Sequence, residues 1–181
     1  MAASPAGPHT STASASTEEA LALFDSLEPV ALDAMVGTWA GEEFPTRHPI
    51  DGLLAATGWY GKQFLDADTV HPLLFHTADY RAVFPVDPAR VPMGLPVPTR
   101  WPLHRVVTAA RPLLRTAKPT ARLRTTEYRG VATATMIYDS KPIHDVFRRL
   151  DADSVLGAMD YRGFDRPYFF VLRRDPGTTV L

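Results

Sequence analysis

The segment Gly37-Thr38-Trp39-Ala40-Gly41 constrains this chain most. Residues two apart in a β-strand point to the same face, so Gly37, Trp39 and Gly41 share one face. Glycines on either side of an indole leave room for a second backbone to approach closely, or for a bulge. The spacing predicts a first strand whose Trp39 closes one end of a small β-barrel.

Length and composition indicate one domain. The chain has 181 residues, a net charge of −1 and no cysteine, which excludes disulfides and thiolate metal sites and fits a reducing compartment. A near-neutral charge gives no reason to expect nucleic acid as a partner. Residues 1–15 lack the features of a secretory signal and are expected to form a disordered tail. With no apolar run of membrane-spanning length, we expect a cytoplasmic protein with one β-barrel domain over residues 16–181.

The first part of this domain, residues 16–84, is expected to hold a helix and the early strands. Ser16 and Glu19 have the spacing of a capping box. An amphipathic stripe then follows at i, i+3, i+4 and i+7, formed by Ala20, Leu23, Phe24 and Leu27. This pattern predicts a helix that caps one end of the barrel. Residues 57–65 and 70–75 are strand candidates, and Pro72 restricts the second to an edge, a bulge or a strand end.

Residues 85–119 form a proline-rich, basic connection. Proline fixes φ and removes a hydrogen-bond donor, so a regular sheet is not expected there. A helix is possible between Leu103 and Leu114. Two interpretations stay open, namely a lid over the barrel mouth and a tolerated surface insertion.

Residues 120–174 alternate short β-branched and aromatic runs with turn sequences such as Arg129-Gly130 and Asp151-Ala152-Asp153. Brief connections favour an antiparallel β-meander. With the earlier strands, about eight to ten strands suffice to close a mainly β, antiparallel up-and-down barrel.

Several blocks of the chain resemble a known family in the same order. GTWAG, GWYGKQF and VHPLLF look like the bacterial GXWXG family, and the stretch from TARLRTTEYRG to PYFFVLRR resembles the C-terminal domain of unknown function that accompanies it. The resemblance implies no particular reaction. The opening Gly-x-Trp is also similar to the first-strand signature of lipocalins, which implies a lipocalin-like barrel at the level of fold alone.

Strand parity selects residues that could carry chemistry inside the barrel. Lys62 shares one parity with Tyr60 and Phe64, and Glu127 shares the more apolar face of its strand. Because an inward charge needs a partner, the pattern predicts a Lys62–Glu127 pair. In the alternative, Lys62 extends to solvent and Glu127 pairs with a surface arginine.

The strand around His144 carries ionisable groups on both faces, so one of them is expected to point inward. His144 is the preferred acid–base candidate, because histidine titrates near neutral pH. Asp139 lies across a short hairpin and could orient it. The alternatives are a hydrogen-bonded wall residue for His144 and a turn cap for Asp139.

Other site types find little support in the sequence. His71, His76, His104 and His144 are too scattered for a metal signature, so neither a metal nor another cofactor is expected. Phosphate-binding loops, dinucleotide fingerprints and the GxSxG elbow of serine hydrolases do not occur.

We therefore expect the chain to bind a small hydrophobic ligand in the barrel lumen. The alternatives are a cofactor-independent isomerase or cyclase that acts on an unsaturated apolar substrate, and an interaction module with a filled core. Neither nucleic acid nor a membrane span is expected. The residues expected to line the pocket are Tyr60, Phe64, His71, Met136, Tyr138 and Phe147.

Overall fold

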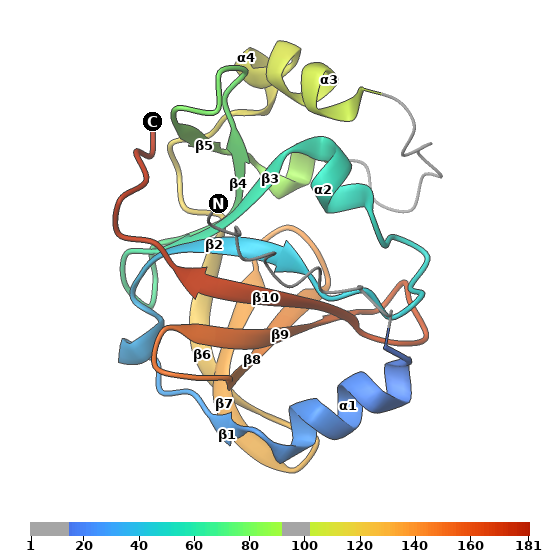
Figure 1. Cartoon of the computed structure of the whole chain (residues 1–181). Coiled ribbons are helices and arrows are strands. Elements are labelled where there is room, and N and C mark those ends of the chain that lie inside the picture. Colours follow the sequence, from blue (N-terminus) through green and yellow to red (C-terminus); the bar gives the residue numbers. More distant parts are fainter. Residues whose placement is uncertain (1–14, 92–101) are drawn as a thin grey trace, which may run out of the picture.

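A computed structural model describes residues 15–91 and 102–181 of the chain (Figure 1). Ten strands in these ranges form one antiparallel sheet. The strands are β1 (Glu28–Pro29), β2 (Gly37–Glu43), β3 (Trp59–Phe64), β4 (Val70–His76), β5 (Val83–Pro85), β6 (Ala121–Tyr128), β7 (Val131–Tyr138), β8 (Ile143–Arg149), β9 (Ser154–Tyr161) and β10 (Tyr168–Arg174). The helices are α1 (Thr17–Ser26), α2 (Leu53–Thr57), α3 (Leu103–Ala109) and α4 (Arg111–Leu114), with 3-10 turns η1 (Asp33–Met35) and η2 (Pro88–Arg90).

The strand pairings return on themselves. The order is β8-β7-β6-β4-β3-β2-β10-β9, and β9 pairs again with β8. Consecutive strands from β6 to β10 pair antiparallel, so the predicted meander is confirmed. β4 pairs with β6 at one residue pair, Val70 with Ala121. Pro72 lies beyond that pairing and within the irregular stretch of the β3–β4 pairing, between His71 and Leu74, as expected for a proline at a bulge.

The Gly-Trp-Gly segment forms the first part of β2. The groups packed against it explain its spacing. Trp39 is 1% exposed; its Nε1 donates to the Met35 carbonyl at 2.8 Å, and the Arg174 guanidinium lies 4.4 Å from its ring. A Cβ on Gly41 would lie 2.2 Å from the Trp59 ring. The missing side chain at Gly41 thus leaves the space that the Trp59 ring occupies.

Gly61 allows the neighbouring strand to approach β2. Its φ is +151°, and a Cβ there would lie 2.0 Å from the Trp39 carbonyl oxygen. The pairing of β3 with β4 is irregular around this residue. Such an irregularity changes which side chains of β3 face inward.

The N-terminal helix has the predicted capping box, with Ser16 and Glu19 each accepting a backbone N–H of the other. Its position differs from the prediction. The buried residues Ala20 and Phe24 pack against a separate apolar cluster on β8, β9 and β10, formed by Val146, Leu156, Ala158, Phe169 and Val171. Helix α1 therefore covers the outer face of these strands, because that face is also apolar. The end near Trp39 is closed by the segment that contains Val30 and Met35.

Part of the proline-rich connection, residues 92–101, lies outside the described residues. The described part includes η2, α3 and α4, and an isolated bridge pairs Val86, the residue after β5, with Arg115. In Figure 1 these helices lie beyond α2, at one end of the molecule. Of the helices in the described ranges, none is long and apolar enough to span a membrane.

The burial of Trp39 leads to a stability prediction. We expect Trp39→Ala to lower the free energy of unfolding by about 3–5 kcal/mol, since a large core aromatic leaves a cavity that neighbours fill incompletely. Urea denaturation measures the change. Tyr80→Ala, at an exposed tyrosine, is the control and should cost much less; equal costs would contradict the packing role of Trp39.

Candidate functional site

A buried ion pair lies inside the ring of strands. Lys62 Nζ and Asp145 Oδ2 are 2.8 Å apart, and their side chains are 3% and 1% exposed. Lys62 comes from β3 and Asp145 from β8, which are not neighbours in the strand order. The pair therefore connects strands across the interior. Two charges out of water are stable only when they are paired and hydrogen-bonded.

Further groups surround the lysine ammonium. Lys62 Nζ donates to the Pro72 carbonyl at 3.1 Å and to the Tyr138 hydroxyl at 3.4 Å. It also lies 5.7 Å from the ring centres of Trp59 and Tyr138, and 5.0 Å from that of Phe170. Aromatic faces attract a cation, more strongly where water is excluded. The interior thus holds a cation in an aromatic cage with one carboxylate.

Burial is the main cause of the pKa shifts of Asp145 and Tyr138. It raises the pKa of Asp145 above the ordinary value, and the nearby Lys62 ammonium and Tyr138 hydroxyl oppose that rise. Burial, together with the charge of Asp145, raises the pKa of Tyr138 well above its usual range. Tyr138 therefore keeps its proton near neutral pH and remains a hydrogen-bond donor.

Two buried polar atoms near the lysine have hydrogen-bonding capacity left over. Within the described ranges, Asp145 Oδ1 and Trp59 Nε1 have no hydrogen-bond partner. Such atoms are uncommon in native proteins and call for an explanation. Trp59 also lines a shallow, open surface depression together with Gly41, Glu42, Glu43, Pro45 and Ala55. Its indole lies between that depression and Lys62.

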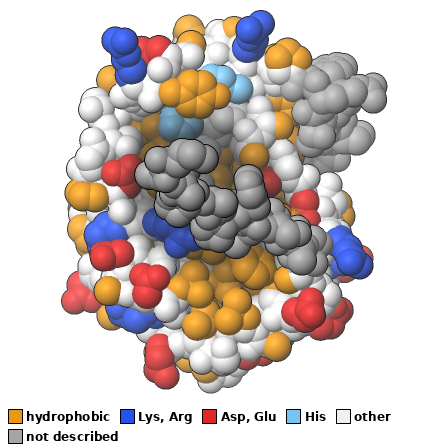
Figure 2. Space-filling model, viewed as in Figure 1, with side chains coloured by type: hydrophobic (Ala, Val, Ile, Leu, Met, Phe, Trp, Pro, Cys, Tyr) orange, Lys and Arg blue, Asp and Glu red, His pale blue; other side chains and the backbone are white. Residues whose placement is uncertain are grey.

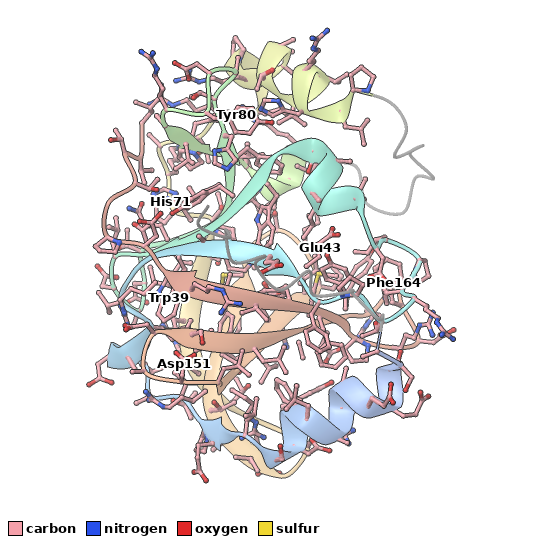
Figure 3. The ribbon with its side chains drawn as sticks, in the orientation of Figure 1. Trp39, Glu43, His71, Tyr80, Asp151 and Phe164 are labelled. Atoms are coloured by element: carbon pink, nitrogen blue, oxygen red, sulfur yellow. The ribbon has the colours of Figure 1, made fainter. Side chains whose placement is uncertain are left out.

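Glu43 fixes the rim of this depression. Its carboxylate accepts the backbone N–H groups of Gly52 and Leu54, both at 2.8 Å. Figure 3 shows Glu43 at the end of β2 that faces α2. The short helix is therefore held against the strand that carries the Gly-Trp-Gly segment.

The predicted inward position of Lys62 is confirmed, but its predicted partner is wrong. Glu127 is exposed on β6, and Asp145 takes the place beside Lys62. The buried positions of β6 end after Leu123, because β4 pairs with β6 at Ala121 alone. The far end of β6 therefore has no strand on that side to enclose Glu127.

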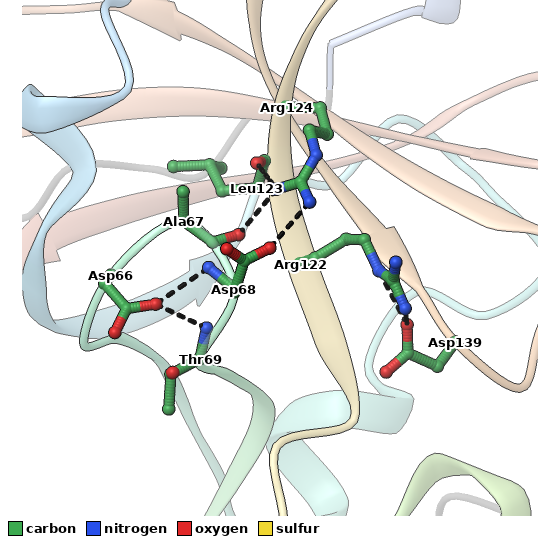
Figure 4. A network of polar contacts seen from close by, with 8 residues as sticks. All are labelled: Asp66, Ala67, Asp68, Thr69, Arg122, Leu123, Arg124 and Asp139. Carbon is green, nitrogen blue, oxygen red and sulfur yellow. Dashed lines mark hydrogen bonds and ion pairs between the residues drawn. The ribbon is translucent and has the colours of Figure 1, made fainter.

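The predicted inward positions of His144 and Asp139 are also wrong. His144 is exposed, whereas Asp145, the next residue of β8, is buried. Asp139 forms an ion pair with Arg122 at 2.9 Å on the outside of the molecule (Figure 4). It therefore does not orient His144. One face of β8 does carry an ionisable group inward, as predicted, and that group is Asp145.

Of the predicted pocket residues, four belong to the interior cluster: Phe64, Met136, Tyr138 and Phe147. Tyr60 does not, because the irregularity at Gly61 reverses its side. Its hydroxyl donates to Asp175 at 2.7 Å, and its ring packs in a separate cluster with Leu74 and Val83. His71 is buried on β4 opposite Gln63, and burial lowers its pKa.

Sequence reasoning missed Asp145, Trp59 and Phe170 as members of the site. A signal for Asp145 was present, since it alternates with the apolar residues Ile143 and Phe147 on one face of its strand. The structure gives no support for a metal centre in the ranges it describes, which contain no group of three or more His, Cys, Asp or Glu side chains placed to hold an ion.

The buried pair leads to a prediction about stability. We expect Lys62→Met to cost about 3–5 kcal/mol of unfolding free energy, because it leaves the Asp145 charge buried without a partner. Adding Asp145→Leu should recover most of the loss, since two apolar side chains then fill the space. Urea denaturation of both variants measures these changes.

Arg122→Met, which breaks the exposed pair with Asp139, is the matched control and should cost about 0–1 kcal/mol. If Lys62→Met costs as little as this control, Lys62 and Asp145 are not desolvated as described.

Comparison with known proteins places the chain in a family. The pattern described as GXWXG protein matches residues 22–79, and the pattern described as domain of unknown function DUF4334 matches residues 119–174. No curated protein matches. A crystal structure of a protein from Thermomonospora curvata is 34% identical, with a TM-score of 0.65 over 86% of this chain and 84% of that one. The chain belongs to the GXWXG family and carries the DUF4334 domain in its C-terminal part.

Proposed function

We propose that this protein binds a small, mainly apolar molecule inside the ring of strands, with one polar group of that molecule against Lys62 and Asp145. The observation that carries the proposal is the unused hydrogen-bonding capacity of Asp145 Oδ1 and Trp59 Nε1 beside a buried cation. A hydroxyl group placed there would satisfy both atoms, because it accepts from the Trp59 indole N–H and donates to the Asp145 carboxylate oxygen. An ion pair kept only for stability gains nothing from leaving these two polar atoms buried without partners.

The surroundings argue for an apolar molecule. The side chains nearest the pair include Trp59, Tyr138 and Phe170, and the same cluster contains Phe64, Met136, Phe147 and Met159. Ligand sites of this kind combine apolar walls with a few polar groups that fix orientation. Because these side chains fill the interior, binding requires some of them to move, and Trp59 borders the surface depression.

The proposal extends to architecture and location. The closed order of pairings supports a lipocalin-like barrel as the container. The absence of cysteine fits a reducing compartment, so the proposed location is the cytoplasm.

Native mass spectrometry of protein purified from its own host tests the binding proposal. We expect a retained small molecule that leaves on denaturation and partitions into organic solvent. The Lys62→Met/Asp145→Leu variant should lose it, because the polar contact is gone while the interior volume stays filled.

The Arg122→Met/Asp139→Leu variant is the matched control, since it replaces an exposed cross-strand pair in the same way. It should retain the molecule in full. If the native protein carries nothing, or if both double variants retain the molecule equally, the proposed site is wrong.

A second function has one specific observation in its favour. Asp145 is a buried carboxylate beside a tyrosine that keeps its proton, which is a base next to an acid. A bound unsaturated molecule could lose a proton to Asp145 and receive one from Tyr138, and the proton on Asp145 would then return to Tyr138 to restore both groups. This pairing suits an isomerase or a cyclase.

Asp145→Asn separates catalysis from binding. If the protein converts the retained molecule, turnover should fall by about 10²–10⁴-fold while the molecule still binds. The wild-type rate should fall as pH drops through the pKa of Asp145, which lies above the ordinary value for aspartate, because the base is then protonated. Chromatography with mass detection follows the conversion; equal turnover in the variant would exclude Asp145 as the base.

A further inference from the structure

One stretch of the chain has an unusual charge distribution. Residues 88–126 contain no Asp or Glu, although the whole chain is close to neutral. The same residues include eight basic side chains: Arg90, Arg100, Arg105, Arg111, Arg115, Lys118, Arg122 and Arg124. The excess of positive charge is therefore local, and a net charge of −1 conceals it.

Acidic residues elsewhere in the fold neutralise part of this excess. Arg122 pairs with Asp139 and Arg124 with Asp68, at 2.9 and 2.6 Å (Figure 4). Arg90 pairs with Asp87, 3.5 Å away. Among the residues of this stretch that the structure describes, three basic residues are exposed and form no ion pair with a described residue: Arg105, Arg115 and Lys118.

Exposed apolar side chains occur between these three basic residues in the sequence. Leu113 on α4 is 74% exposed, and Val106 on α3 is 55% exposed. Ala109 and Pro112, between them in the sequence, are exposed as well. Figure 2 shows basic and hydrophobic side chains together over α3, at the end of the molecule that lies beyond α2 in Figure 1. The five residues Arg105, Val106, Leu113, Arg115 and Lys118 are called the α3–α4 surface below.

We propose that the α3–α4 surface docks on an anionic lipid membrane. Arginine and lysine are attracted to the phosphates of such a surface, and aliphatic side chains among them enter the boundary between headgroups and acyl chains. Charge attraction and apolar insertion together hold a protein at a membrane more firmly than either interaction alone. Nucleic acid fits less well, because the exposed apolar side chains of this surface are aliphatic and offer no ring for base stacking.

Arg111 lies at the limit of the α3–α4 surface. Arg111 is not part of it, because its guanidinium lies 5.2 Å from the Phe84 ring and shares a shallow hollow with Asp79 and the C-terminal Leu181. Docking therefore involves α3, the exposed side of α4 and the residues up to Lys118. This inference does not depend on a ligand inside the ring.

Sedimentation with lipid vesicles tests the proposal on the full-length protein. We expect binding to phosphatidylcholine vesicles that contain phosphatidylglycerol, little binding to pure phosphatidylcholine vesicles, and release as salt is raised. The triple variant Arg105→Gln/Arg115→Gln/Lys118→Gln should bind at least about tenfold more weakly, since three attractive charges are removed. Val106→Gln/Leu113→Gln should also weaken binding, with the charges intact.

Matched controls keep this test specific. Arg47→Gln/Arg162→Gln/Arg173→Gln removes the same charge from exposed positions elsewhere, and Leu65→Gln replaces a leucine that is 52% exposed in the β3–β4 turn. Both should bind like the wild type, and circular dichroism checks that every variant is folded. The proposal is overturned if the wild type ignores anionic vesicles, if control and test variants lose binding equally, or if single-stranded RNA is bound in place of vesicles.

Discussion

The cost of removing Lys62 from water is the constraint on which the interior depends. An ammonium group on a side chain that is 3% exposed is costly to bury unless nearby groups replace the water. Four kinds of group replace the water here: the Asp145 carboxylate, the Pro72 carbonyl, the Tyr138 hydroxyl and three aromatic rings. These groups belong to five strands, β3, β4, β7, β8 and β10, so their convergence requires the strand order to return on itself.

The glycines of the first two long strands make this convergence possible. Gly61 allows the β3 backbone to lie against the Trp39 carbonyl, and the irregular pairing there turns Tyr60 away while Lys62 faces inward. Gly41 leaves the volume that the Trp59 ring occupies. An alanine at either position would force backbone or indole to shift. The Gly-x-Trp-x-Gly spacing thus serves the position of Lys62 as much as the burial of Trp39.

The elements and the site differ in how far sequence could predict them. Period-2 runs identified the C-terminal strands, and the capping box placed the start of α1, because both depend on local chemistry. Parity also indicated an inward Lys62. It failed for Tyr60 because one irregular residue reverses the alternation, and it failed for Glu127 because burial there depends on whether β4 extends along β6. The partner of Lys62 comes from a distant strand, so strand pairing decides it and local pattern cannot.

Packing connects the α3–α4 surface to the interior through α2. A Cβ on Gly58, which ends α2 with a φ of +76°, would lie 2.3 Å from the His104 ring on α3, so the two helices meet without space between them. The other end of α2 is held to β2 by Glu43. Ala55 of α2 and Trp59 line the same depression. Contacts thus run from α3 through α2 to the wall beside Trp59, whose ring centre is 5.7 Å from the Lys62 ammonium.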